Sequence, residues 1–401
     1  MNLSKEEWKI AIQQAAAKHF DTIKSIRRHI HQHPELSFQE TNTSDFIKGQ
    51  LRKYGISFTE NWVKTGILAE IKGKSEQIVA LRADMDALPI QEKNNCAYAS
   101  VNEGVMHACG HDVHTASVLG AAIILQELKE NLPVTVQFVF QPGEEKLPGG
   151  AKLMLEAGVF KMLPKAILAQ HVYPSLPAGK VGFKAGQYMA STDEIYITVS
   201  GRGGHAAMPH QVIDPVIMSA QILIALQQIC SRLASPLMPT VLSFGKVVAN
   251  GATNVIPDKV YLEGTFRTFN ETWRNEGHQY IIKIATEVAE AFGGKCDVEI
   301  KKGYPALFNN EELTNNCQNE AAFYLGKENV VVLDQRMTAE DFAWFAQEIP
   351  ACFYRLGTAG ENGTFSSGVH TSTFDIDEEA LVTGMGLMAW LAVQELESGD
   401  L

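Results

Sequence analysis

The chain has 401 residues, of which 45% are hydrophobic and 20% are charged, a composition typical of an ordinary globular protein. The net charge of −12 argues against a nucleic-acid partner, because binding to the phosphate backbone needs a surplus of lysine and arginine. The length exceeds the size at which a single hydrophobic core usually stops growing, so we expect two domains.

The first twenty residues predict an amphipathic helix, with Trp8, Ile12, Ala15 and Ala16 on one face. They contain no apolar run typical of a signal peptide, and we find no stretch that reaches the roughly eighteen apolar residues of a membrane span. The six cysteines are scattered and form no C-x-x-C pair. We therefore expect a cytoplasmic protein with reduced thiols and no membrane partner.

Three strand-like runs that end in polar clusters follow, at residues 77–86, 134–145 and 165–174. Between the first two, residues 114–130 have the apolar spacing of a helix. Strands that alternate with helices favour an α/β fold with a mostly parallel sheet. In such sheets functional sites lie beyond the carboxyl ends of the strands, and the polar clusters are expected there.

The middle of the chain has a different pattern. The predicted elements in order are a half-exposed strand at 191–206, a helix at 212–232, strands at 240–250 and 259–268, a helix at 271–292 and a strand at 296–304. This β-α-β-β-α-β order is that of a small ferredoxin-like α+β unit. We therefore expect an inserted domain of residues 190–304, and a metal-binding catalytic domain formed by residues 1–189 and 305–401.

The segment MHACGHDVHTA, residues 106–116, is rich in side chains that bind metals. Cys109 and His111 are two residues apart in a predicted loop, and thiolate and imidazole are good ligands for zinc and its neighbours in the first transition row. Taken alone, the pair is weak evidence, because a buried cysteine beside a structural histidine is the more common explanation. The pair becomes informative only together with donors from other segments.

Such donors follow two later strands. Glu144 and Glu145 follow a glycine at the end of a predicted strand. Adjacent carboxylates repel each other when they are buried without a cation. A solvated loop is the alternative explanation. His171 lies at the tip of the next predicted strand, and His370 lies in a loop near the end of the chain. Both are further candidate ligands.

With these residues, the sequence resembles the amidohydrolase branch of the aminoacylase and carboxypeptidase superfamily of metallopeptidases. Hippurate hydrolases, N-acyl-amino-acid amidohydrolases and auxin-conjugate hydrolases belong to this branch. The matching motifs occur in order along nearly the whole chain. They are IHQHPELSFQE (30–40), LRADMDALPI (81–90), MHACGHDVHTA (106–116), QPGEE (141–145), AQHVYP (169–174), GRGGHAAMPH (201–210), GATNVIPD (251–258), GTFRT (264–268), TAEDFAWF (338–345) and GVHTSTFDIDEEAL (368–381).

The resemblance implies a site for two divalent metal ions, manganese or zinc, with cobalt or nickel as alternatives. The implied ligands are Cys109, His111, Glu145, His171 and His370, with Cys109 bridging both ions. The wider superfamily has an H-x-D pair and a bridging aspartate. This chain has arginine at the first of these positions and cysteine at the bridge, which points to the amidohydrolase branch.

The resemblance also implies catalytic and substrate-binding residues. Glu144 is expected to act as the general base, and Asp84 is expected to support a metal-bound imidazole or the bridge. His205 is expected to reach the active site of a partner subunit and to donate a hydrogen bond to the developing oxyanion. Asn254 and Arg267 are expected to hold the substrate carboxylate. The inserted domain would then serve as a lid and dimerisation domain in a homodimer or a dimer-based oligomer.

We therefore expect hydrolysis of the amide bond of small N-acyl amino acids, which gives a carboxylic acid and a free amino acid. A dipeptidase or carboxypeptidase is the alternative of similar class. A relative that binds metal or ligand without catalysis is the alternative of a different class. Glu144 beside a full ligand set argues against this last possibility.

Overall fold

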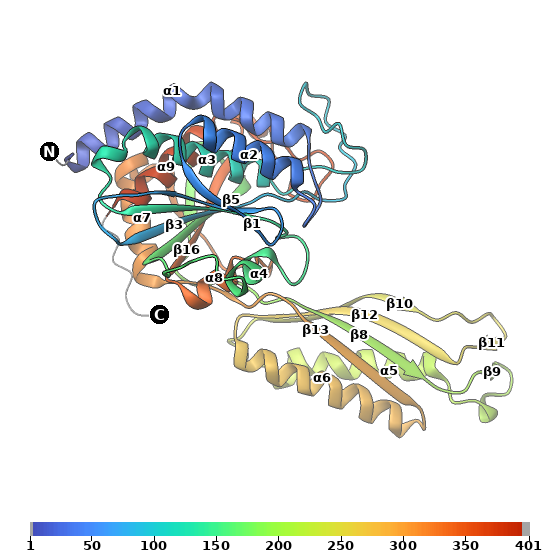
Figure 1. The fold of residues 1–401 in the computed structure, drawn as a ribbon. Coiled ribbons are helices and arrows are strands. Elements are labelled where there is room, and N and C mark those ends of the chain that lie inside the picture. Colours follow the sequence, from blue (N-terminus) through green and yellow to red (C-terminus); the bar gives the residue numbers. More distant parts are fainter. Residues whose placement is uncertain (1–2, 395–401) are drawn as a thin grey trace. The chain divides into compact units, whose positions relative to one another are not determined.

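The computed structural model describes residues 3–394, and within them the chain divides into two compact units (Figure 1). The first unit comprises Met1–Gly186, Phe308–Asp334 and Asp341–Leu401, and the second comprises Gln187–Leu307 and Gln335–Glu340. The short segment 335–340 thus clusters with the second unit, although the sequence assigns it to the catalytic domain. Residues 1–2 and 395–401 of the expected catalytic domain lie outside the described residues.

The first unit is built on a mixed sheet with a parallel centre. In the described part of the chain this sheet has eight strands, in the order β1-β2-β4-β3-β5-β16-β6-β15. The pairs β4/β3, β3/β5 and β5/β16 are parallel. Its strands are β1 (Ser57–Trp62), β2 (Gly66–Ile71), β3 (Ile78–Asp84), β4 (Thr135–Gln141), β5 (Ala166–Pro177), β6 (Val181–Phe183), β15 (Val330–Val332) and β16 (Ala351–Ala359).

Helices cover both faces of this sheet (Figure 1). They are α1 (Lys5–Gln32), α2 (Thr41–Lys53), α3 (His111–Glu127), α4 (Gly150–Glu156), α7 (Glu311–Leu325), α8 (Ala343–Glu348) and α9 (Ala380–Val393). α1, α3 and α9 pack together on one face, and α4 and α8 lie on the other. The inner face of α1 carries the predicted Trp8, Ile12, Ala15 and Ala16, and all four are buried in the main core. The predicted α/β class is confirmed.

The main elements of the second unit have the predicted β-α-β-β-α-β order. They are β8 (Asp193–Ser200), α5 (Pro215–Gln228), β10 (Thr240–Val248), β12 (Lys259–Thr268), α6 (Glu271–Ala291) and β13 (Lys295–Lys302). The short strands β9 (Gly204–His205) and β11 (Val255–Ile256) pair with each other, and β7 (Gly186–Met189) and β14 (Leu307–Asn309) lie at the unit boundaries. The sheet order is β10-β12-β8-β13 with antiparallel neighbours throughout. α5 and α6 pack on one face of this sheet (Figure 1), which is the ferredoxin-like arrangement.

One helix of the second unit is more apolar than the sequence analysis anticipates. Pro215–Leu233, which comprises α5 and the turn after it, is long and apolar enough to cross a membrane by length and composition alone. One face of this helix, with Met218, Ile222 and Leu226, is buried in the core of its own unit. The other face exposes Ile217 and Ile224. We interpret it as a helix that packs on its sheet and leaves an apolar surface outward.

Candidate metal centre

The five donors that the sequence assigns to metal binding lie in one region of the first unit. Cys109 directly precedes Gly110 and α3, and His111 is the first residue of that helix rather than part of the expected loop. Glu145 follows β4, His171 lies within β5, and His370 lies in the segment that leads to α9. The region is thus at the carboxyl ends of the parallel strands, where α/β sheets place their sites.

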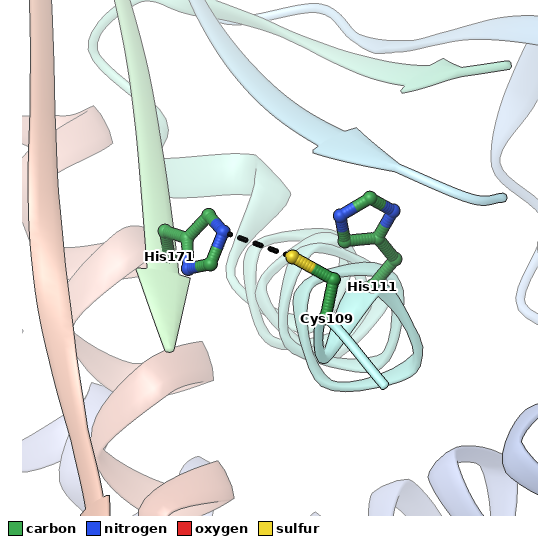
Figure 2. Close-up of side chains that lie close together, drawn as sticks. All are labelled: Cys109, His111 and His171. Atoms are coloured by element: carbon green, nitrogen blue, oxygen red, sulfur yellow. Dashed lines mark hydrogen bonds between the residues drawn. The ribbon is translucent and has the colours of Figure 1, made fainter. Parts of the chain in front are cut away.

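Cys109 lies between the other donors. Its Sγ is 3.5 Å from Nε2 of His171 and 3.3 Å from Nε2 of His370. Figure 2 marks the contact between Cys109 and His171 with a dashed line. The donor atoms of Cys109, His111 and His171 lie within 4.8 Å of one another, and so do those of Cys109, Glu145 and His370. The thiol sulfur belongs to both groups. This arrangement suits two cations that share one thiolate ligand.

Gly110 explains how Cys109 and His111 can flank a helix start that has no side-chain cap. Its φ of 81° is in the left-handed region that favours glycine. A Cβ atom at this position would lie 2.6 Å from Cγ2 of Val172, the residue after His171. Both the backbone angle and the close approach to β5 therefore require glycine between the two donors.

Asp86 holds three parts of the site in place, and the sequence analysis missed it. Its carboxylate accepts hydrogen bonds from the backbone N–H groups of Glu144, at 3.1 Å, and Glu145, at 2.9 Å. It also lies 3.2 Å from Nδ1 of His111. Asp84, which the sequence assigns to this supporting role, is farther away, with Oδ2 3.7 Å from Nε2 of His111. The two carboxylates are only two residues apart, so their spacing in the sequence does not show which of them contacts His111.

Hydrogen bonds on the far side of two imidazole rings fix their orientation. Nδ1 of His171 is 2.8 Å from the carbonyl oxygen of Val172, and a carbonyl can only accept, so Nδ1 carries the proton. Nδ1 of His111 donates in the same way to Asp86, whose pKa is lowered by the hydrogen bond from His111 although burial opposes ionisation. Both rings therefore direct the lone pair of Nε2 toward the centre of the site, as metal-bound histidines do.

The residues at the centre fit a cation. Among the described residues, Nε2 of His111 makes no hydrogen bond although it is buried. Oε1 of Glu145 is also buried and lies 3.2 Å from Nε2 of His370. An unsatisfied buried polar atom costs about 1–3 kcal/mol, and a cation beside His111 would satisfy its Nε2. Burial, and then the charge of Glu145, raises the pKa of the Cys109 thiol, so a thiolate there needs a nearby cation.

Glu144 has different surroundings from its neighbour Glu145. It is 6% exposed, and its Oε1 accepts a hydrogen bond of 3.3 Å from the backbone N–H of Asp341. A carboxylate oxygen of Glu144 also lies within 4.8 Å of the donor atoms of His111 and Glu145. Glu144 is thus held by the backbone beside the candidate ligands, within reach of a water molecule bound there.

A second buried network connects the sheet to this site. Asp84 accepts a hydrogen bond of 2.7 Å from Arg82 and lies 2.6 Å from Nδ1 of His114. Nε2 of His114 accepts from the backbone N–H of Val172, at 2.9 Å, and Arg82 also donates to Asp341, at 2.7 Å. Burial opposes ionisation of Asp84, but the charge of Arg82 lowers its pKa well below the usual range. Asp84 and His114 therefore brace β5 against α3.

The three remaining predicted residues lie in the second unit. His205 and Asn254 are exposed neighbours in the small β9/β11 ribbon, where the backbone N–H of Ala206 donates to the carbonyl oxygen of Asn254 at 3.0 Å. Arg267 is half-buried near the opposite end of β12 and donates to the carbonyl oxygen of Met337 at 3.1 Å. The eight residue-to-residue steps of strand from Lys259 to Arg267 span roughly 26 Å. Within one chain, Asn254 and Arg267 are therefore too far apart to hold the same carboxylate.

Comparisons with known proteins agree with this geometry. Residues 80–394 match the sequence profile of the peptidase family M20/M25/M40. The chain belongs to this family. This M20 family member is 39% identical over 376 residues to the N-acetyl-L-cysteine deacetylase of Bacillus subtilis, with 94% of this chain and 88% of the relative covered. It is 44% identical over 287 residues to the N-acyl-L-amino acid amidohydrolase of Geobacillus stearothermophilus, with 71% of this chain and 77% of the relative covered.

A solved structure supports the same membership. The crystal structure of the Bacillus subtilis YXEP protein, described as a dinuclear metal-binding peptidase of the M20 family, matches this M20 family member with a TM-score of 0.82. The two are 38% identical, and the match covers 95% of this chain and 99% of the other. The resemblance inferred from the motifs is confirmed.

Proposed function

We propose that this protein hydrolyses the amide bond of N-acyl amino acids with the help of two divalent metal ions. The products are a carboxylic acid and a free amino acid. The observation that carries the proposal is the pair of donor groups that share Cys109, with Glu144 held beside them. The names of the deacetylase and amidohydrolase relatives support the substrate class.

Bound divalent ions supply positive charge that acidifies a water molecule and polarises the amide carbonyl. Glu144 removes the proton of the attacking water and later gives it to the nitrogen of the leaving amino acid. The backbone N–H of Asp341 orients its carboxylate for both steps. Asp86 fixes the backbone of Glu144 and Glu145 relative to His111, so the base and the ligands keep their spacing.

We assign Cys109 as the shared ligand, with His111, Glu145, His171 and His370 completing the set. A soft thiolate with nitrogen and oxygen donors suits zinc, and the same set also accepts manganese, cobalt or nickel. The site depends on a reduced thiol, and all six cysteines of the chain are free. A reducing compartment such as the cytoplasm therefore suits the protein.

We further propose that the active form is a homodimer in which His205 and Asn254 complete the site of the partner subunit. Their distance from Arg267 along β12 supports this proposal, because one chain does not bring the three residues together. The second unit also exposes apolar side chains on α5, with Ile217 at 53% and Ile224 at 66% exposure. An exposed apolar surface of this kind is typical of an interface between subunits.

A substrate panel tests the function. Metal-free protein is reloaded separately with manganese and with zinc and is then incubated with N-acetyl, N-benzoyl and N-indoleacetyl amino acids and with dipeptides, while release of the free amino group is measured. We expect turnover of N-acyl amino acids that disappears in Glu144→Gln. Preferential turnover of dipeptides would instead indicate a peptidase. Metal binding without turnover of any compound would indicate a non-catalytic relative.

A further inference from the structure

A fully buried arginine on α1 connects two segments that carry candidate metal ligands. Arg27 has no exposed surface, and it sits on the inner face of α1 beside the core residues Ile23, Ile26 and Ile30. A buried guanidinium is costly unless acceptors of opposite charge surround it closely. An apolar residue would pack on this helix face without that cost. We therefore look for the function of the positive charge in the groups that Arg27 contacts.

The first contact of Arg27 is at the start of α3. Its Nε donates to Oδ2 of Asp112 at 2.7 Å, and Asp112 directly follows the candidate ligand His111. His31, one turn along α1, lies 2.8 Å from the same carboxylate oxygen. Asp112 is itself fully buried. α1 therefore holds the first turn of α3, and with it the Cys109–His111 segment, through a charged hydrogen-bond network.

The second contact is in the segment that carries His370. Nη2 of Arg27 donates to Oδ1 of Asp375 at 2.8 Å, and Asp375 follows His370 by five residues. The other oxygen of Asp375 accepts from the hydroxyl of Tyr98 at 2.8 Å. Asp375 is only 7% exposed, so little water is available to replace a lost partner. One planar guanidinium thus spans two carboxylates from segments more than 250 residues apart in sequence.

We propose that Arg27 is a positioning residue for the metal centre. Its rigid fork fixes the spacing between the segment with Cys109 and His111 and the segment with His370. This inference rests on the proposed metal-dependent function. Without the guanidinium, two buried carboxylates lose their shared partner, and the two segments lose their common anchor. The ligands then enclose the cations less closely, although no ligand has changed.

The adjacent arginine provides a matched control. Arg28 lies on the same helix and binds Glu378 through Nε, at 2.8 Å, and through Nη2. Its side chain is 43% exposed, and its hydrogen bonds to Glu378 reach neither Asp112 nor Asp375. Removing Arg28 deletes a positive charge from the same turn of α1 and leaves the connection between the two segments intact.

Zinc affinity of the folded protein tests the proposal. Five proteins are stripped of metal, checked for native circular dichroism and titrated with zinc against a chromophoric chelator. They are wild type, Arg27→Lys, Arg27→Met, Asp375→Asn and Arg28→Met. Lysine keeps the charge but cannot span two carboxylates, so we expect Arg27→Lys to weaken binding of at least one ion by about 10–100-fold, as for other residues that orient ligands. Arg27→Met should lose at least as much, and Asp375→Asn should lose less. Arg28→Met should bind as wild type.

A second readout is turnover as a function of metal concentration. If Arg27 acts through ligand spacing, Arg27→Lys needs more metal for half-maximal turnover, whereas Arg28→Met does not. Wild-type zinc affinity in Arg27→Lys, or equal losses in Arg27→Lys and Arg28→Met, would overturn the proposal. If the Arg27 variants do not fold, wild-type affinity in Asp375→Asn would overturn it as well. Wild-type protein that takes up no metal would instead refute the proposed function itself.

Discussion

Glu144 and Glu145 are adjacent in the sequence, but their side chains have different partners. Oε1 of Glu145 lies 3.2 Å from Nε2 of His370, among the candidate ligands. Oε1 of Glu144 accepts from the backbone N–H of Asp341 instead. Two chemically identical side chains, one residue apart after β4, therefore lie in different surroundings.

This difference predicts separate effects of substitution. Glu144→Gln keeps the shape of the side chain and removes its basicity, so we expect about two metals per subunit and a loss of turnover of roughly 10²–10⁴-fold. Metal content of the purified variant and its kcat are the measurements. Glu145→Gln is the comparison, and it should lose metal as well as turnover. A loss of metal in Glu144→Gln would place Glu144 among the ligands.

Cys109 is predicted to be needed for both ions. A serine hydroxyl does not ionise near neutral pH, so Cys109→Ser should weaken metal binding and abolish turnover together. Cys230→Ser, in the second unit, is the control and should change neither. A thiol-modifying reagent should also inactivate the metal-free protein faster than the metal-loaded protein. Equal rates in the two forms would contradict a role for Cys109 as ligand.

Glu40 is predicted to make stability depend on pH. Burial, and then the charge of Asp86, raises the pKa of Glu40 to about 7, from 4.5. The folded protein therefore holds this proton at pH values where the unfolded chain has released it, and stability falls as pH rises through this window. The full effect is on the order of 3 kcal/mol.

Glu40→Gln tests this dependence. Glutamine can mimic the protonated side chain, because Oε1 accepts from the backbone N–H groups of Phe38 and Gly143 while its amide faces the hydroxyl of Thr65. We expect the free energy of unfolding of the variant to fall less between pH 4.5 and pH 8 than that of wild type. Urea unfolding of both metal-free proteins across this range is the measurement. Parallel curves would show that Glu40 does not titrate there.

At the scale of elements, the start of α3 depends on one glycine. Gly110→Ala forces a left-handed φ of 81° on alanine and brings its Cβ against Val172. We expect a loss of about 2 kcal/mol or more in the free energy of unfolding, together with weaker metal binding, since Cys109 and His111 flank this position. Gly158→Ala is the matched control, because Gly158 has a φ of 73° with no atom within 4 Å of the added carbon. Equal losses in both variants would show that only the backbone angle matters.

Elements with a clear period were predictable from the sequence. Among the fully buried strands, β3 and β4 were also predictable because each run ends in a polar cluster, whereas β16 was not. The alternation of Ile195, Ile197 and Val199 predicts β8, and the order of the second unit follows from such patterns. β16 has nine buried residues in a row without alternation, and such a run does not distinguish a strand from a buried helix. The start of α3 was missed by three residues because Gly110 replaces the usual side-chain cap.

The residues of the candidate site that lie in recognisable motifs were predictable from the sequence. The five donors and Glu144 come from motifs that the resemblance identifies, and the structure brings them together. Asp86 was not predictable, because residues two apart in an extended chain point the same way. Only the fold shows that Asp84 binds His114 whereas Asp86 binds His111. The contacts of Arg27 were equally hidden, since they join segments far apart in the sequence.

At the scale of the whole molecule, the proposed dimer predicts complementation between two inactive variants. Glu144→Gln disables a catalytic unit but keeps His205, and His205→Ala does the reverse. If His205 acts in the partner's site, each mixed dimer has one site with both residues intact. With random pairing about half of the dimers are mixed, so co-expression should restore roughly a quarter of wild-type activity. No recovery, or a monomer by sedimentation, would refute the shared site.

The chain returns to its first unit only after residues 187–307 of the second unit, and this sets an order of events during synthesis. β16, which lies between β5 and β6 in the sheet, and α9, which packs against α1 and α3, both follow the insertion. The other four donors leave the ribosome about 200–260 residues before His370, which is roughly 10–50 s at ordinary rates of translation. They are Cys109, His111, Glu145 and His171. Four of the five donors of a nascent chain are therefore exposed to metal ions in solution before His370 has been synthesised.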